Sequence, residues 1–182
     1  MTAKRKISLL CVSLVFSTAL SAQIEVAHLF SKGLSATGFG AFLRVGVPIA
    51  SGDEISGDLG FQYFSTNGHN LLVLPLLAGY RHYFDRSGSG LYLEPMAGYS
   101  FGATDIQKMD QYGSPIYDEN GHEVDMKISG ATAGLGFGYL IPSFPLNLGL
   151  RYIHLFVSGD PAQNVVSFRV SYALAFARRD KN

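Results

Sequence analysis

The chain has 182 residues, a formal net charge of zero and 15% charged residues, whereas soluble domains contain about 25%. Aromatic residues reach 13% and glycines number 21, yet no segment after the N-terminal one has the about 20 apolar residues of a transmembrane helix. This composition argues against an ordinary soluble domain, and the absence of excess positive charge argues against a nucleic-acid partner.

The N-terminal segment has the three parts of a secretory signal peptide. Residues 4–6 are basic, residues 7–20 are uncharged and mostly apolar, and small residues lead up to Ala22. We therefore predict a cleaved leader over residues 1–22 and one domain over residues 23–182. Cleavage removes three of the 14 basic residues and none of the 14 acidic ones, which leaves a formal net charge of −3.

Cys11 is the only cysteine, and it lies inside this leader. Because Leu10 rather than a small residue precedes it, we expect no lipidation. The mature chain then has no thiol, which excludes disulfides, thiolate metal sites and cysteine nucleophiles. The histidines show no paired spacing such as H-E-x-x-H, so we predict neither a metal nor a cofactor.

Eight segments alternate large apolar residues with small or polar ones, and turn signals separate them. Alternation at period two is typical of a β-strand with two different faces. No helical period competes with it. The predicted strands are Ile24–Ser31, Ala36–Ile49, Ile55–Phe64, Leu71–Phe84, Leu91–Gly102, Ile128–Ile141, Leu146–Val157 and Val165–Arg179.

The two faces differ too much for a soluble sheet. A soluble barrel needs a charged outer face, but the second face here consists mostly of Gly, Ala and Ser. Such a face suits the inside of a narrow barrel, in which eight strands leave room only for side chains. The apolar face then meets lipid, where a sheet must close to satisfy its edge amides. The sequence therefore predicts an all-β fold, an eight-stranded antiparallel up-and-down transmembrane β-barrel.

Connection lengths and aromatic positions predict how the barrel sits in the membrane. Short connections at 50–54, 85–90 and 142–145 alternate with the connections at 65–70, 105–127 and 158–164. Short turns are periplasmic and longer loops external in outer-membrane barrels, so we expect a Gram-negative outer membrane, extracellular loops and periplasmic termini. Two aromatic girdles are expected, one of Phe84, Tyr139, Phe144 and Phe176 and one of Phe39, Tyr63, Phe101 and Phe156.

The signal peptide, the eight strands, "LPLLAGYRHYF", "LYLEPMAGYSFG" and the aromatic-rich last strand resemble the small outer-membrane β-barrel superfamily. It includes OmpX-like and OmpA-type barrel domains and many Bacteroidetes-type barrels, and the resemblance covers essentially the whole mature chain. It implies that the barrel-assembly machinery recognises the last strand, where Tyr172, Leu174 and Phe176 match the alternating positions. "ARRDKN" follows Phe176, whereas many members end at the aromatic residue. No peptidoglycan-binding domain follows, so an OmpA-like wall tether is not implied.

Charged residues of inward parity are expected to meet inside the barrel. They are Arg44, Asp58, Arg81, Glu94, Arg151 and Arg169, and Glu25 could join them. The first four come from consecutive strands, at similar distances from their periplasmic turns. We expect an ion-paired network that fills the lumen, because an unpaired buried charge is costly. A gated pore or an anion site is the alternative.

Residues 105–127 form the one long connection, with six acidic residues against two lysines. Asn120-Gly121 predicts a type I′ hairpin, so strands five and six should project as a ribbon. Ile116, Tyr117, Val124 and Met126 would offer adhesive side chains. "DENGHEVD" lacks the calcium-loop spacing. We expect this loop to bind an extracellular protein or surface ligand through its edge.

An enzymatic alternative depends on His154, which has lipid-facing parity near the external end and precedes Ser158 and Asp160. Small barrel enzymes that deacylate lipid A place a His/Ser pair at this interface. Their H-x-S spacing is absent, because Phe156 occupies the required position. We therefore predict a non-enzymatic role in surface interaction or envelope structure, with a lipid A-modifying enzyme and a narrow low-conductance pore as alternatives.

Overall fold

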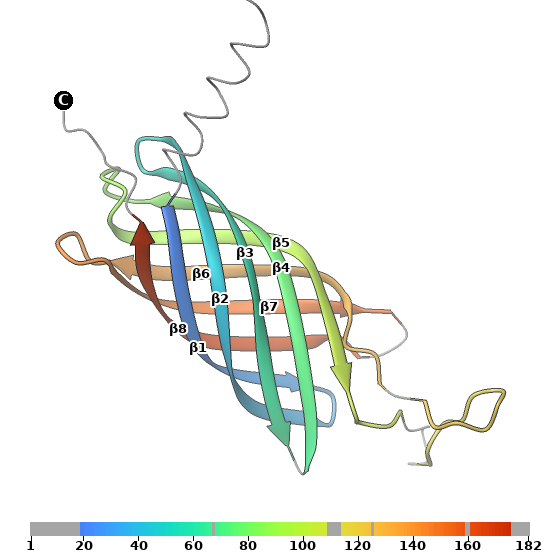
Figure 1. Ribbon diagram of the computed structural model, residues 1–182. Coiled ribbons are helices and arrows are strands. Elements are labelled where there is room, and N and C mark those ends of the chain that lie inside the picture. Colours follow the sequence, from blue (N-terminus) through green and yellow to red (C-terminus); the bar gives the residue numbers. More distant parts are fainter. Residues whose placement is uncertain (1–18, 67, 109–113, 125, 159–160, 176–182) are drawn as a thin grey trace, which may run out of the picture.

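The computed structural model describes residues 19–66, 68–108, 114–124, 126–158 and 161–175. They form the strands β1 (Ala19–Ser31), β2 (Leu34–Ala50), β3 (Asp53–Thr66), β4 (His69–Tyr83), β5 (Gly90–Thr104), β6 (Gly130–Leu140), β7 (Leu146–Val157) and β8 (Gln163–Ala175). Consecutive strands pair antiparallel, and β1 pairs with β8, so the sheet closes into a barrel (Figure 1). The predicted eight-stranded antiparallel up-and-down barrel is confirmed. No helix of the described residues has the length and apolar character that crossing a membrane requires.

The strand bounds differ most from the expected ones at the two ends of the chain. β1 begins at Ala19, and its first four residues, which belong to the predicted leader, pair with residues 43–46 of β2. Cleavage after Ala22 stays a prediction, and the rest of the leader lies outside the described residues. The last described residue of β8 is Ala175, so residues 176–179 of the predicted last strand also lie outside them.

Side chains alternate across the barrel wall because successive residues of a strand point to opposite faces. On β8, Phe168 and Tyr172 are 48% and 50% exposed, whereas Arg169 between them is fully buried. The same alternation puts large apolar residues on the outside of every strand. A closed barrel with this outer surface buries it in lipid, where the closed ladder leaves no edge amide unpaired.

The connections divide between two ends. The end that contains Ala19, Ala175 and the connections 51–52, 84–89 and 141–145 is called the terminal end here, and the opposite one the loop end. Connection 105–129 lies at the loop end and extends beyond the barrel (Figure 1). Exposed aromatic residues lie near both ends: Phe84, Tyr139 and Phe144 at the terminal end, and Phe39, Phe101 and Phe156 at the loop end. Phe176 lies outside the described residues.

The lumen has two chemically different halves. Toward the loop end, inward apolar side chains form a dry core, which consists of Ala27, Leu29, Ala36, Phe64, Leu71, Val73, Leu77, Met96, Ile128, Ile153, Leu155 and Val165. Toward the terminal end, the inward side chains are charged or polar. The alternation in the sequence predicts mostly small residues on the whole inner face. The apolar half of the lumen was therefore not predicted.

Candidate functional site

Glu94 on β5 is the centre of the charged half of the lumen. Its carboxylate accepts a hydrogen bond from Arg81 Nη2 at 3.0 Å and from Arg169 Nη2 at 2.6 Å. Arg44 Nη1 and Ser56 Oγ also donate to it, the latter at 3.0 Å. One buried carboxylate on β5 therefore connects β2, β3, β4 and β8. The three arginines around it offset the cost of burying its charge.

A second group of charges joins this centre through Asp58 on β3. Arg151 on β7 lies 2.6 Å from Glu25 and 3.4 Å from Asp58. Arg44 also lies 3.4 Å from Asp58, and its register partner across the β2–β3 ladder is Asp58. Gln62 Nε2 donates to Glu25 at 3.1 Å. The charges thus form one continuous network rather than separate pairs.

Glu54 completes the network, although the sequence predicts that it lies in a turn. The structure places it in β3, where it accepts a hydrogen bond from Arg44 Nη2 at 2.9 Å. The missed signal was parity, because Glu54, Ser56 and Asp58 alternate on one face. With Glu54, four arginines meet four carboxylates: Arg44, Arg81, Arg151 and Arg169 against Glu25, Glu54, Asp58 and Glu94. All six charged residues expected from the sequence are in this network.

Inward glycines make room for the large side chains. A Cβ on Gly136 would lie 3.0 Å from Arg169 Nη2, and one on Gly149 would lie 3.0 Å from Arg169 Nε. Tyr92 lies beside them; its hydroxyl accepts from Arg169 at 3.2 Å and donates to Asn147 Oδ1 at 2.9 Å. The space beside these glycines of β6 and β7 is therefore occupied by the side chains of Arg169 and Tyr92.

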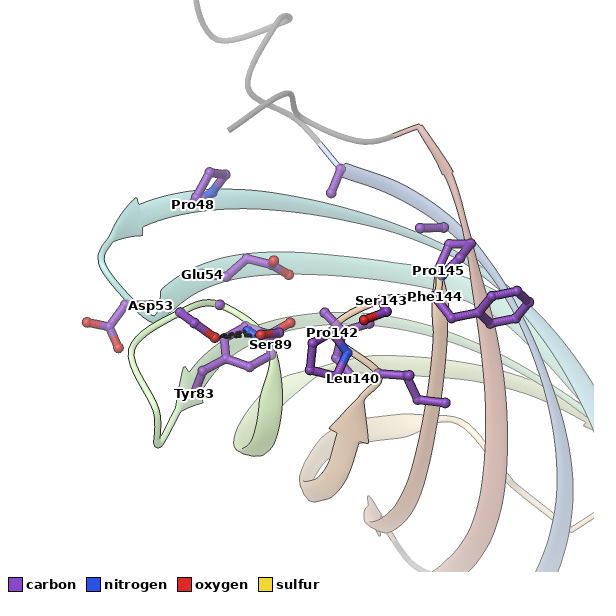
Figure 2. A pocket seen from close by; sticks show the side chains of 15 residues that line it. Pro48, Asp53, Glu54, Tyr83, Ser89, Leu140, Pro142, Ser143, Phe144 and Pro145 are labelled. Atoms are coloured by element: carbon purple, nitrogen blue, oxygen red, sulfur yellow. Dashed lines mark hydrogen bonds between the residues drawn. The ribbon is translucent and has the colours of Figure 1, made fainter. Parts of the chain in front are cut away.

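A cavity opens at the terminal end, and it is called the vestibule here (Figure 2). Its volume is about 450 Å³, and Pro48, Tyr83, Leu140 and Phe144 are among the residues that line it. Glu54 also lines this cavity. A smaller cavity of about 80 Å³ shares several of the same lining residues and extends to the charged network. Arg44 and Arg81 thus line a cavity beside the vestibule, although both are almost fully buried.

The hairpin at residues 114–124 is the most exposed part of the loop end. The backbone N–H groups of His122 and Asn120 donate to the Asp118 carboxylate, each at 2.8 Å, and they hold the pKa of Asp118 below its ordinary value. Among the described residues, Arg86 is the only non-glycine with positive φ, whereas Gly121 has φ 82°. The predicted type I′ turn is therefore wrong. The Asp118–Gly121 hydrogen bond closes a turn in which glycine alone takes the left-handed conformation.

The base of the same connection closes the lumen. Ile106 and Met126 pack against the apolar core, and the Met126 N–H donates to the Ile106 carbonyl at 2.8 Å. Met126, Ile116 and Val124 were expected to be adhesive, but Met126 covers the core and the other two are half-buried. Tyr117 is the only one of the four that is exposed, at 56%.

His154 lies on the outer surface near the loop end. Its Nδ1 lies 2.8 Å from the Asn164 amide oxygen, which also accepts from Tyr152 at 2.6 Å. The His154 ring packs edge-on against Phe156 with ring centroids 4.4 Å apart. Asp160 lies outside the described residues. Among the described residues, His154 thus contacts the amide of Asn164 and the ring of Phe156.

The residues that match the assembly signal lie on the outside of the last strand. Tyr172 and Leu174 of β8 are 50% and 55% exposed, and Phe176 lies outside the described residues.

No protein-family model matches this sequence, and no curated protein does. Among solved structures, Ail, the attachment invasion locus protein of Yersinia pestis, is similar with a TM-score of 0.59 and 10% identity, over 86% of this chain and 97% of Ail. Its complex with the heparin analogue sucrose octasulfate gives 0.58 and 11%, with the same coverage. Neisserial surface protein A gives 0.54 and 18%, over 86% of this chain and 96% of that protein. The chain therefore has the fold of the eight-stranded outer-membrane β-barrels.

Proposed function

We propose that the protein resides in the outer membrane of a Gram-negative bacterium, with its loop end extracellular and its terminal end periplasmic. The apolar outer surface of every strand supports the membrane location, because such a surface is stable only in lipid. The lengths of the connections support the orientation. No connection at the terminal end is longer than six residues, whereas the longest one, 105–129, is at the loop end.

We further propose that the barrel is a non-enzymatic surface protein, whose hairpin at 114–124 binds a basic patch on a partner protein. The observation that carries this proposal is the charge of the exposed hairpin. Asp118, Glu119 and Glu123 are exposed there, and this segment has no lysine or arginine. An acidic hairpin favours a cationic partner, and the exposed Tyr117 adds an aromatic contact of the kind enriched at interfaces.

Hydrogen bonds hold the hairpin in a fixed position, which supports a role in recognition. The Ile116 N–H donates to the Lys108 carbonyl at 2.9 Å, and Gln107 donates to the Glu123 carboxylate. Below it, Met126 packs on the apolar core of the lumen. A preorganised loop loses less entropy on binding than a free one. Ail binds a polyanionic heparin analogue in one of its structures, and the charge of this hairpin favours a ligand of the opposite sign.

The experiment neutralises the hairpin without altering its turn. The triple variant Asp118→Asn/Glu119→Gln/Glu123→Gln keeps the acceptor oxygen of residue 118. Binding of a lysine-rich peptide to the barrel in zwitterionic nanodiscs is measured by surface plasmon resonance at 0.15 M salt. We expect at least a tenfold loss of affinity, with Asp85→Asn at the terminal end as the control. Sucrose octasulfate should bind neither form. Equal peptide binding by all forms would refute the proposal.

Two alternatives receive less support. A lipid A-modifying enzyme needs an activated nucleophile, but His154 contacts the Asn164 amide, and Ser158 makes no hydrogen bond to it in the described residues. A pore needs an open path, but the apolar half of the lumen is closely filled. Mass spectrometry of lipid A with and without the gene tests the enzyme, and single-channel recording in planar bilayers tests the pore. A modified lipid A or steady conductance would replace the proposed role.

A further inference from the structure

We infer that the vestibule at the terminal end binds a small organic cation that carries an apolar group, such as an arylalkylammonium ion, with Glu54 as the counter-ion. The inference goes beyond the surface role proposed above. It does not depend on which side of the membrane the terminal end faces. It rests on the volume of the vestibule, on its walls and on the Glu54 carboxylate that lines it.

The vestibule has the size and walls of a small-molecule site. Its volume of about 450 Å³ falls within the range of about 300–1,000 Å³ that is usual for ligand pockets. Leu140, Pro142 and Pro145 form an apolar wall on the side of β6 and β7 (Figure 2). This wall belongs to the described chain after the predicted leader, so it remains whether or not the leader is removed. An apolar group of the ligand would pack against it.

Glu54 supplies the polar contact on the facing wall. Figure 2 shows its side chain between the strand that holds Pro48 and the apolar wall. Its Oε1 accepts from Arg44 Nη2 at 2.9 Å, and Oε2 accepts no hydrogen bond within the described residues. The side chain is 15% exposed. A carboxylate with one free oxygen at the edge of an apolar cavity is a partner for an ammonium group.

The neighbouring charges favour a cation over an anion. No lysine or arginine is among the described residues that line the vestibule. Arg44 and Arg81 line only the smaller cavity, where both already donate to Glu94. Asp53 also lines the vestibule, but its Oδ1 accepts from Tyr80 and lies 2.7 Å from His82 Nδ1. Among the described residues, the vestibule is therefore lined by the carboxylates of Glu54 and Asp53 and by no lysine or arginine.

Tyr83 adds a second feature that suits a cation. Tyr83 lines the vestibule with 3% of its surface exposed, and its hydroxyl accepts from Arg81 Nη1 at 3.2 Å. An aromatic ring face attracts an organic cation, by about 0.5–1 kcal/mol at exposed sites. A ligand ammonium bound between Glu54 and this ring would leave Arg44 with Asp58 and Glu94 as its other partners. Binding would therefore not dismantle the network below.

Three probes of similar shape and different charge test the inference on the barrel in nanodiscs. They are 2-phenylethylammonium, the neutral 2-phenylethanol and the anionic 3-phenylpropionate. Each is titrated while backbone amide shifts are followed by NMR, with empty nanodiscs to measure partition into lipid. We expect saturable binding of the ammonium ion, with the largest shifts at the vestibule. The alcohol should bind at least tenfold more weakly, and the anion should not saturate.

Variants then locate the site. Glu54→Gln should weaken binding of the ammonium ion at least tenfold, Leu140→Trp should abolish it by filling the cavity, and Glu54→Asp should retain part of it. Asp105→Asn, at the loop end and outside the hairpin at 114–124, is the matched control and should bind like the wild type. Circular dichroism and thermal unfolding verify that each variant is folded. Binding that is equal in Glu54→Gln and Leu140→Trp, equal for the alcohol, centred elsewhere or absent would overturn the inference.

Discussion

Glu94 Oε2 and Arg169 Nη2 lie 2.6 Å apart, although their strands β5 and β8 are not neighbours in the barrel. The contact crosses the lumen, so it joins opposite walls that the backbone ladder joins only through the intervening strands. Arg44 and Arg81 donate to the same carboxylate from β2 and β4. The terminal half of the barrel is therefore braced by side chains across its interior.

The bracing predicts a large loss of stability in Glu94→Gln. The variant leaves three buried guanidinium groups facing a neutral amide, and removal of one partner of a buried ion pair costs about 3–5 kcal/mol. Urea unfolding in lipid bilayers measures the loss, with Glu123→Gln on the exposed hairpin as the control. The double variant Glu94→Gln/Arg169→Met should recover part of the stability. A loss below about 1 kcal/mol would mean that water screens the network.

The glycines of the inner face predict a second stability difference. A Cβ on the inward Gly138 would overlap the Tyr92 hydroxyl oxygen, whereas a Cβ on Gly57, which is exposed on the outer face, would meet nothing within 4 Å. Gly138→Ala should therefore destabilise the barrel by about 1–3 kcal/mol through overpacking, and Gly57→Ala should have little effect. Thermal unfolding of the two variants compares them. Similar unfolding temperatures would show that Tyr92 moves aside without cost.

The period-two pattern was sufficient to predict the strands and their faces, because burial of alternate residues leaves a direct trace in the sequence. Parity also brought Arg44 and Glu94 to one side of the wall, and their pairing follows from the narrowness of an eight-stranded barrel. The pattern did not reveal that Glu54 belongs to the network, since a residue beside a turn signal reads as loop. The turn at Asp118 also escaped, because a side-chain acceptor rather than the Asn-Gly pair sets its geometry.

The long connection should have two separable parts. Removal of residues 105–127 takes away Ile106 and Met126, which cover the apolar core, so we expect lower stability and faster amide exchange in Leu155 and Val165. Replacement of residues 116–122 alone by a Gly-Ser linker should leave that exchange unchanged and remove only peptide binding. Native-state hydrogen exchange in nanodiscs distinguishes the two. Equal protection of both core residues in the two variants would show that the base of the connection does not seal the lumen.

The Asp118 turn should depend on pH in the acidic range only. Hydrogen bonds from the His122 and Asn120 N–H groups lower the pKa of Asp118 from its ordinary value of 3.8, so the folded turn favours the ionised form. Its contribution is complete above the ordinary pKa and is lost as the pH falls through the lowered one. Amide exchange at His122 should therefore be unchanged between pH 7 and pH 5 and faster well below pH 4. Asp118→Asn keeps an acceptor that does not titrate, so its exchange should lack the acid step once intrinsic rates are corrected. A step of equal size in the variant would assign the acid dependence to another group.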